Sequence, residues 1–384
     1  MGKKRILSIL DSIDFYGKEK ANILVYSVVA RLGCDLLILF NEKASMQLKD
    51  ALYKYPHQSI PFPRCIVGGW KIFRYPLLFI SSNWKVYRII RAYKPDFILL
   101  PTEVALSYLF LPLLITRKRL VFRMGDDPIV LRFSGCFSKL YSLFWRNLIV
   151  NRLHAVVCIT NYIQENLIRS GFKRKDRLRV IYNYPPVASR GVGAEINLDK
   201  RSDGLKFGFI GRIVPEKGLL LLVESIANLK KQGVNCLLFV AGVTTLDPDY
   251  STKIFQVIRD NHLEHSIVFL GRVENVEFFF RKIDVLCVPS IYPEPSGNVI
   301  VEGKWFGRPA IVFDKGGMPE LVDHLQDGYI CKEANVNGLK EALLYYIRSS
   351  DAVFQQGRMA KKSLEQKGIT FSSFCSQWQS VFEE

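Results

Sequence analysis

The chain has 384 residues, of which 49% are hydrophobic, and it carries a formal net charge of +17 at pH 7. At this length the expected organisation is two domains of roughly 190 residues each, and the apolar content is ample for two cores. The longest uncharged apolar stretch, residues 104–116, is shorter than the about 20 residues that a membrane-spanning helix needs, which excludes such a helix.

The N-terminus and the cysteines indicate a cytoplasmic protein. The first residues, MGKKRILSILDSID, have a basic start but reach Asp11 and Asp14 too soon for a signal peptide, and are better interpreted as a first strand. The eight cysteines are scattered without a C-x-x-C pair, which is typical of reduced thiols. The five histidines form no metal-binding pattern, so no metal site is predicted.

The charge is divided unevenly. Residues 1–190 contain 31 Lys and Arg against 12 Asp and Glu, whereas the remainder contains 22 against 24. Such asymmetry predicts an anionic partner for the basic half: a nucleic acid, a membrane surface or a charged substrate.

Short apolar runs alternate with helical patterns through the first half of the chain. Helices are predicted at residues 21–33 and 161–171, and strands at residues 4–10, 35–40, 96–101, 119–124, 154–160 and 178–183. Apolar strands that alternate with helices favour a parallel sheet covered on both faces.

A segment rich in Pro, Gly, Ser and charge, residues 185–204, interrupts this alternation and predicts an interdomain linker. The predicted division of the chain is 1–190 for the first domain, 191–204 for the linker, 205–368 for the second domain, and 369–384 for a C-terminal helix packed back on the first domain.

The second half repeats the pattern, so the predicted fold class is α/β, with two doubly wound domains in tandem. Ligands of such sheets bind beyond the carboxyl ends of the strands, and the expected site is therefore a cleft between the domains. Helices are predicted at residues 218–233, 250–262 and 276–283, and strands at 205–211, 236–242, 266–271, 285–290 and 309–313.

The segment GRIVPEKG, residues 211–218, follows the first strand of the second domain. Gly211 lets a ligand approach the backbone, and the helix expected to begin near Gly218 contributes partial positive charge at its N-terminus. Arg212 and Lys217 beside that terminus favour a diphosphate. The alternative is that both are surface cations on an ordinary turn.

Two carboxylates, Glu294 and Glu302, flank the segment PSGNVIV. Pro293 and Pro295 exclude regular structure around Glu294, so it is expected in a loop at the carboxyl end of a strand. A helix that begins near Asn298 places Glu302 about one turn further on. A carboxylate accepts two hydroxyl donors, as a ribose or a hexose offers. For either glutamate alone, a solvated loop or helix residue is the alternative.

Together these motifs resemble glycosyltransferase family 4 (glycosyl transferases group 1), whose members are retaining glycosyltransferases of the GT-B fold, with two Rossmann-like domains facing a central cleft. The resemblance spans about residues 205–344 and continues weakly into the first half through GKEKAN, residues 17–22. The matching segments are 211–218, the E-x7-E motif 294–302, GRPAIV at 307–312, GGMPELV at 316–322 and DGYI at 327–330.

The resemblance implies roles for the charged residues. Arg212 and Lys217 would hold the diphosphate of a UDP- or GDP-sugar and stabilise the charge that develops as it leaves. Glu302 would accept the ribose hydroxyls, and Glu294 would bind hydroxyls of the transferred sugar. No cofactor and no metal ion are expected, because the two cations supply the positive charge.

Other donor-binding residues are implied to act mainly through the backbone. The base would lie against residues 271–275, and Gly17 would let the N-terminal loop approach the diphosphate. The first domain would bind the acceptor, with Asp126 or Asp127 lining that side; a helix N-cap pair is the alternative for these two. These further donor-binding residues are Gly17, Gly211, Val273, Gly297, Asn298 and Val299.

Aromatic and basic residues are interleaved at residues 70–94 and 137–154. Such segments suit an anionic membrane surface, so the protein is expected to attach peripherally to the cytoplasmic face of a membrane and to use a glycan or lipid-linked acceptor. Helices that simply cover the sheet are the alternative. Other hypotheses are a sugar-nucleotide epimerase or phosphorylase of the same fold and, less favoured, a protein that binds nucleic acid.

Overall fold

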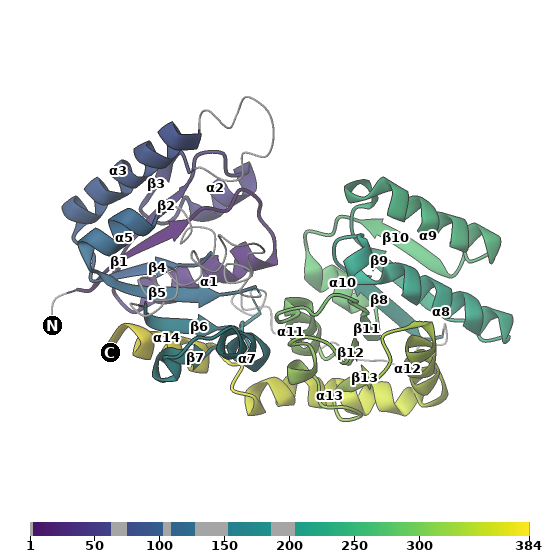
Figure 1. Ribbon diagram of the computed structural model, residues 1–384. Coiled ribbons are helices and arrows are strands. Elements are labelled where there is room, and N and C mark those ends of the chain that lie inside the picture. The colour runs from purple at the N-terminus through teal and green to yellow at the C-terminus, as the bar shows by residue number, and fades with distance from the viewer. Residues whose placement is uncertain (1–2, 63–74, 103–108, 127–152, 186–203, 384) are drawn as a thin grey trace. The chain divides into compact units, whose positions relative to one another are not determined.

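The chain forms two compact units, each built around its own parallel sheet. The computed structural model describes residues 3–62, 75–102, 109–126, 153–185 and 204–383 (Figure 1). One unit comprises Met1–Tyr182 with Ser372–Glu384, and the other comprises Asn183–Phe371. The predicted linker, 191–204, lies outside the described residues except for Gly204.

Unit 1 is a seven-stranded parallel sheet with the strand order β3-β2-β1-β4-β5-β6-β7. The order grows in one direction from β1 to β3 and in the other from β4 to β7, so it reverses between β1 and β4. The strands are β1 (Arg5–Leu10), β2 (Asp35–Asn41), β3 (His57–Ile60), β4 (Phe97–Leu100), β5 (Arg119–Met124), β6 (Leu153–Cys158) and β7 (Leu178–Val180). The helices are α1 (Gly17–Arg31), α2 (Met46–Leu52), α3 (Tyr75–Tyr93), α5 (Phe110–Thr116), α7 (Asn161–Arg169) and the short 3-10 helix η4 (Lys175–Arg177).

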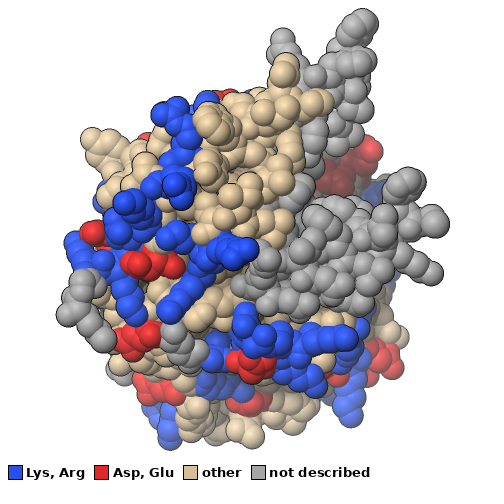
Figure 2. All heavy atoms as spheres, turned by 60° about the vertical axis from the view of Figure 1, so that its left-hand side comes forward, with Lys and Arg blue, Asp and Glu red and all other residues tan. Residues whose placement is uncertain are grey.

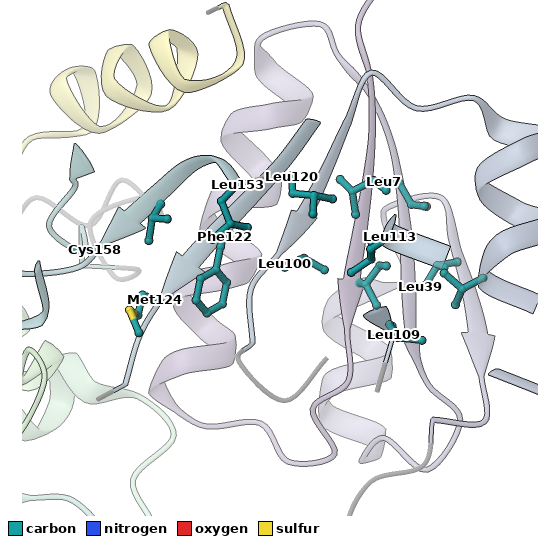
Figure 3. Packing of buried hydrophobic residues seen from close by; sticks show 14 of the residues in the cluster. Leu7, Leu39, Leu100, Leu109, Leu113, Leu120, Phe122, Met124, Leu153 and Cys158 are labelled. Atoms are coloured by element: carbon teal, nitrogen blue, oxygen red, sulfur yellow. The ribbon is translucent and has the colours of Figure 1, made fainter. Parts of the chain in front are cut away.

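The core of unit 1 lies between the sheet and its covering helices. Figure 3 shows leucines of several strands converging with Phe122 of β5 and with Leu113 of α5. Val86 and Ile90, on the inner side of α3, belong to the same buried cluster. Burial of such side chains stabilises the fold by about 1.5–3 kcal/mol each.

The last helix, α14 (Phe371–Glu383), belongs to unit 1 from Ser372 onward. Its Trp378 and Phe382 are buried, and the ring of Phe382 meets that of Phe97 edge-on at 5.5 Å. Nζ of Lys4 donates a hydrogen bond to the carbonyl oxygen of Phe382. The end of the chain therefore completes the core next to the first strands.

Unit 2 is a six-stranded parallel sheet with the order β10-β9-β8-β11-β12-β13, which reverses between β8 and β11. Its strands are β8 (Lys206–Ile210), β9 (Leu237–Ala241), β10 (Ile267–Gly271), β11 (Val285–Val288), β12 (Ala310–Phe313) and β13 (Gly328–Cys331). Its helices are α8 (Leu219–Lys231), α9 (Pro248–Asp260), α10 (Val276–Lys282), α11 (Asn298–Trp305), α12 (Val336–Arg348) and α13 (Ser350–Gln366), and its 3-10 helices are η6 (Pro215–Lys217), η7 (Thr244–Leu246) and η8 (Pro319–Leu321).

The predicted strands and helices are found, with differences at their ends and with further elements that the pattern did not predict, among them α5. The strand predicted at 285–290 ends at Val288, because Pro289 has no N–H to donate to a neighbouring strand. The strand predicted at 178–183 ends at Val180. Helix α2 and strands β3 and β13 were not predicted, since each is short and has little periodicity.

The cysteines described in the structure are free thiols: Cys34, Cys158, Cys236, Cys287, Cys331 and Cys375. Burial raises the pKa of Cys158, Cys236 and Cys331 to about 12, so these thiols stay protonated at neutral pH. Cys65 and Cys136 lie outside the described residues. None of the described helices is both long enough and apolar enough to cross a membrane.

A fully buried ion pair connects α11 to the loop before β13. Nζ of Lys304 lies 2.6 Å from Oδ2 of Asp327 and donates a second bond of 2.6 Å to the carbonyl oxygen of Leu321. The side chains are 0% and 1% exposed. The other carboxylate oxygen of Asp327 accepts from the backbone N–H of Asp323. Burial lowers the pKa of Lys304, and Asp327 opposes this shift.

We expect Lys304→Met to lower the free energy of unfolding of unit 2 by about 3–5 kcal/mol, because it leaves the Asp327 carboxylate buried without its counter-ion. The double variant Lys304→Met/Asp327→Asn should lose less, since no unpaired charge remains. Lys332→Met, at an exposed lysine of the same unit, serves as the control and should be neutral. Calorimetry and denaturant titration measure these changes. A double variant as unstable as Lys304→Met would contradict the role given to the charge.

Candidate functional site

The candidate site lies at the carboxyl edge of the unit 2 sheet, where the strand order reverses between β8 and β11. The loops that leave two strands at such a point diverge to opposite faces of the sheet and leave room for a ligand between them. The loop after β8 contains residues 211–218, and the loop after β11 contains residues 289–297. These are the two segments that the sequence predicted as a ligand site.

An ion pair joins the two loops. Nζ of Lys217 lies 2.6 Å from Oε1 of Glu294, and the two side chains are only 26% and 13% exposed. The hydroxyl of Ser290 donates to the same carboxylate oxygen. Within the described part of the chain, Oε2 of Glu294 accepts no hydrogen bond from the protein. One oxygen of this carboxylate is therefore held by the protein, and the other can accept hydrogen bonds from a ligand.

Gly218 allows the two loops to approach this closely. It has φ +70°, in the left-handed region, and a Cβ placed there would lie 1.9 Å from the carbonyl oxygen of Pro289. The backbone N–H of Ile291 donates to the carbonyl oxygen of Glu216 at 2.9 Å. A backbone contact of this kind fixes Lys217 opposite Glu294, and only glycine leaves space for it.

A third loop, after β12, supports Glu294 from the other side. Gly316 has φ +64°, and a Cβ there would lie 2.3 Å from the carbonyl oxygen of Glu294. The backbone N–H of Gly317 donates to that oxygen at 2.7 Å. The backbone of Glu294 is thus held between two loops, which orients its side chain.

Helix α11 begins directly after the loop that carries Glu294. Gly297 precedes it with φ +75° and ψ 61°, so the chain enters the helix through a left-handed residue. Oδ1 of Asn298 accepts a hydrogen bond of 2.7 Å from the side chain of Asn183. Val299 and Glu302 are partly buried, and Glu302 stands in the second turn, as predicted. The partial positive charge at this helix start favours an anionic or polar ligand atom.

The remaining donor-binding candidates of unit 2 lie on neighbouring loops of the same edge. Arg212, directly after Gly211, is exposed, and it forms no ion pair within the described residues. The N–H of Gly211 donates to the carbonyl oxygen of Ala241 at 2.9 Å, which holds the start of the loop against β9. Val273 is partly buried in the turn between β10 and α10.

Two of the three candidates of unit 1, Gly17 and Asp126, lie at the carboxyl edge of its own sheet. Gly17 is the first residue of α1, and its neighbour Lys18 places Nζ 2.6 Å from Oδ2 of Asp126, after β5. Asp126 is therefore paired with a cation. Asp127, the other candidate, lies outside the described residues.

Sequence reasoning missed three residues of these sites. Ser290 was assigned only to the end of a strand, and Gly316 only to a motif, although both hold Glu294. Lys18 was not considered as a partner of Asp126. The glycine pair GG at 316–317 was the available signal for Gly316. For Lys18 no signal existed, because its partner lies more than a hundred residues away.

A metal site would require several His, Cys, Asp or Glu side chains close together. Among the residues that the structure describes, no group of three or more His, Cys, Asp or Glu side chains is arranged to hold a metal ion. Lys217 and Arg212 are the cations on the two candidate loops of unit 2.

Known proteins resemble both halves of the chain. Residues 29–184 match the family model described as Glycosyltransferase Family 4, and residues 195–363 match Glycosyl transferases group 1. The uncharacterized glycosyltransferase MJ1178 of Methanocaldococcus jannaschii is 32% identical over 255 residues, which is 65% of this chain and 61% of that protein. The capsular polysaccharide biosynthesis glycosyltransferase CapM of Staphylococcus aureus is 22% identical over 55% of this chain and 57% of its own length. The chain thus spans about three fifths of these two relatives.

Among solved structures, HepE of Anabaena in complex with UDP matches with a TM-score of 0.78 at 22% identity, over 99% of both chains. Together with the two parallel sheets, this likeness shows that the molecule has the GT-B fold. The chain belongs to glycosyltransferase family 4, whose models match its two halves. The fold, family and enzyme class predicted from the sequence are confirmed.

Two glycines provide a matched test of the close approach between the loops. Gly218 and Gly233 both have positive φ, +70° and +77°, but a Cβ at Gly233 would meet no atom within 4 Å. We expect Gly233→Ala to lose about 1–2 kcal/mol from backbone strain alone. Gly218→Ala adds a clash with the Pro289 carbonyl and should lose clearly more. Thermal unfolding measures both, and equal losses would contradict the importance of the contact.

Proposed function

We propose that this protein transfers a sugar from a UDP- or GDP-sugar to a glycan or lipid-linked acceptor, with retention of the anomeric configuration. The observation that carries the proposal is the Lys217–Glu294 pair, held at 2.6 Å between the loops that follow β8 and β11. In a nucleotide sugar the diphosphate and the sugar meet at the bond that breaks. A cation that can bind the diphosphate and a carboxylate that can bind sugar hydroxyls lie side by side in this pair.

Lys217 and Arg212 are proposed to bind the diphosphate. The Lys217 ammonium has three donors, and its bond to Glu294 uses one of them. The other donors, with the exposed guanidinium of Arg212, can reach phosphate oxygens. When the bond from the anomeric carbon to the diphosphate breaks, negative charge grows on the leaving oxygen, and these cations stabilise it. In this proposal no metal ion is required.

Glu294 is proposed to orient the transferred sugar. Since Lys217 and Ser290 both bind Oε1, the remaining oxygen is positioned to accept sugar hydroxyls. The backbone N–H groups at Gly297, Asn298 and Val299 would contact the sugar or the phosphate. In retaining transfer, the acceptor hydroxyl attacks the anomeric carbon on the face that the diphosphate leaves.

The nucleoside is proposed to lie further along the same edge of unit 2. Glu302 would accept the ribose hydroxyls, and the base would contact the turn that contains Val273. Gly17 would allow unit 1 to approach the donor, and Asp126, with its partner Lys18, would line the acceptor side. The structure of HepE contains UDP, which supports a UDP-sugar rather than a GDP-sugar as the donor.

The acceptor is proposed to belong to cell-surface polysaccharide or glycolipid assembly, at the inner face of a membrane. The name of CapM, a capsular polysaccharide biosynthesis glycosyltransferase, supports a role in polysaccharide assembly. The surplus of Lys and Arg in residues 1–190 supports an anionic surface as partner.

The test uses a panel of UDP- and GDP-sugars, with thermal shift for binding and slow hydrolysis of the donor for turnover. We expect wild type to be stabilised by its donor nucleotide. Lys217→Ala should lower donor turnover by about 100-fold or more, because it removes charge stabilisation from the leaving group. Glu294→Gln should keep nucleotide binding but lower turnover of the sugar donor.

Arg281→Ala is the matched control, because it also breaks a 2.6 Å ion pair of unit 2, with Glu277 on the exposed side of α10. It should leave donor turnover unchanged. If no nucleotide sugar stabilises wild type, or if Arg281→Ala and Lys217→Ala are equally active, the proposed function is wrong.

A further inference from the structure

Helix α3 of unit 1 presents an unusual outer face. Leu77, Ile80 and Trp84 are 71%, 63% and 59% exposed, although large apolar side chains are normally covered when they lie together. Their spacing of three and four residues places them in one stripe along the helix. The core-facing residues of α3, including Val86 and Ile90, lie on the opposite side. The outer stripe is therefore not needed for the fold of unit 1.

Helix α5 extends this apolar face. It packs beside α3 (Figure 1) and exposes Leu111 and Ile115, which are 42% and 64% accessible, while Leu113 between them is buried in the core. The exposed apolar side chains thus come from two adjacent helices, and we call the surface of Leu77, Ile80, Trp84, Leu111 and Ile115 the apolar face.

Cations continue the same stripe. Arg88 and Arg91 follow Trp84 at four and seven residues, and both are exposed, as are Lys85 and, at the end of α5, Arg117. The segments 75–95 and 109–125 contain no Asp or Glu. Figure 2, which turns this side of the molecule forward, shows a broad uncharged area bordered by Lys and Arg.

We propose that the apolar face and its cations dock the protein on an anionic membrane, with α3 lying along the surface. The apolar side chains would enter the boundary between headgroups and acyl chains, Trp84 would lie at the level of the headgroups, and Arg88 and Arg91 would bind lipid phosphates. This inference extends the proposed function, from which it takes the expectation of a lipid-linked acceptor.

Charge favours lipid over a second copy of the chain as the occupant. A symmetric dimer through this face would bring the same cations of two chains together, without an acidic residue in either helix to balance them. An anionic bilayer neutralises these cations and at the same time covers the apolar side chains.

The experiment is co-sedimentation of the full chain with vesicles of phosphatidylcholine, alone or with one third phosphatidylglycerol, at low and moderate salt. Wild type should bind the anionic vesicles much more tightly. Arg88→Gln/Arg91→Gln should bind about thirtyfold more weakly, and Ile80→Ser/Trp84→Ser about tenfold or more. Bromolipids should quench the tryptophan fluorescence of wild type more than that of Trp84→Phe.

Matched controls change the same kinds of residue elsewhere in unit 1. Met46→Ser/Tyr53→Ser removes exposed apolar side chains at α2, and Lys173→Gln/Lys175→Gln removes exposed charges beside β7. These variants should bind vesicles as wild type does, and circular dichroism verifies that every variant is folded. Equal losses in the controls, or wild-type binding by the α3 variants, would overturn the proposal.

Two further readouts separate the alternatives. Sedimentation velocity without lipid would overturn the proposal if wild type were a dimer that Ile80→Ser/Trp84→Ser dissociates. Hydrolysis of the soluble donor should be unchanged in the α3 variants, because the residues proposed to bind the diphosphate and the transferred sugar belong to unit 2. Vesicle binding without donor turnover would contradict the proposed function alone, whereas donor turnover without vesicle binding by wild type would contradict this inference alone.

Discussion

The close approach of two backbone loops at the reversal of the unit 2 sheet is the constraint on which the candidate site depends. Gly218 leaves no space for a side chain against the Pro289 carbonyl, and this contact brings Lys217 within 2.6 Å of Glu294. Parallel strands require long crossovers, so loops distant in sequence come together at the carboxyl edge of the sheet, and the reversal of strand order leaves room for a ligand between them. Lys217 and Glu294 are 77 positions apart in the sequence. Because the backbone contact already holds the two loops together, the ion pair forms without a further loss of backbone entropy.

The buried ion pair between Lys304 and Asp327 stabilises the same edge of the unit 2 sheet. Lys304 joins α11 to Leu321 and Asp327, and α11 begins at the loop that carries Glu294. Because removal of either charge would leave its partner buried and unpaired, the pair opposes any shift of α11 relative to β13. Because Lys304 holds α11 near its C-terminal end, the N-terminal turn of α11 and Glu302 keep a constant position. Rigidity of this kind suits a site that must hold a flexible donor while one bond breaks.

Helix α3 of unit 1 has apolar side chains on both its inner and its outer side. The inner side of α3 contributes Val86 and Ile90 to the core, and its outer side exposes Ile80 and Trp84. Exposure of that outer stripe has a free-energy cost in water that a membrane surface would remove. The proposed membrane surface would bring the protein and the proposed lipid-linked acceptor into the same plane.

Local sequence determined much of this molecule. The alternation of apolar strands with helices predicted two doubly wound units. Motifs of a few residues singled out Glu294, Glu302, Arg212 and Lys217 as candidates, since strand ends, prolines and helix starts are local features. Tertiary structure alone decided which of them meet. Lys217 pairs with Glu294, Gly316 lies against the backbone carbonyl of Glu294, and Lys18 pairs with Asp126. Both ion pairs join residues far apart in the sequence, because they arise from the order of strands in each sheet.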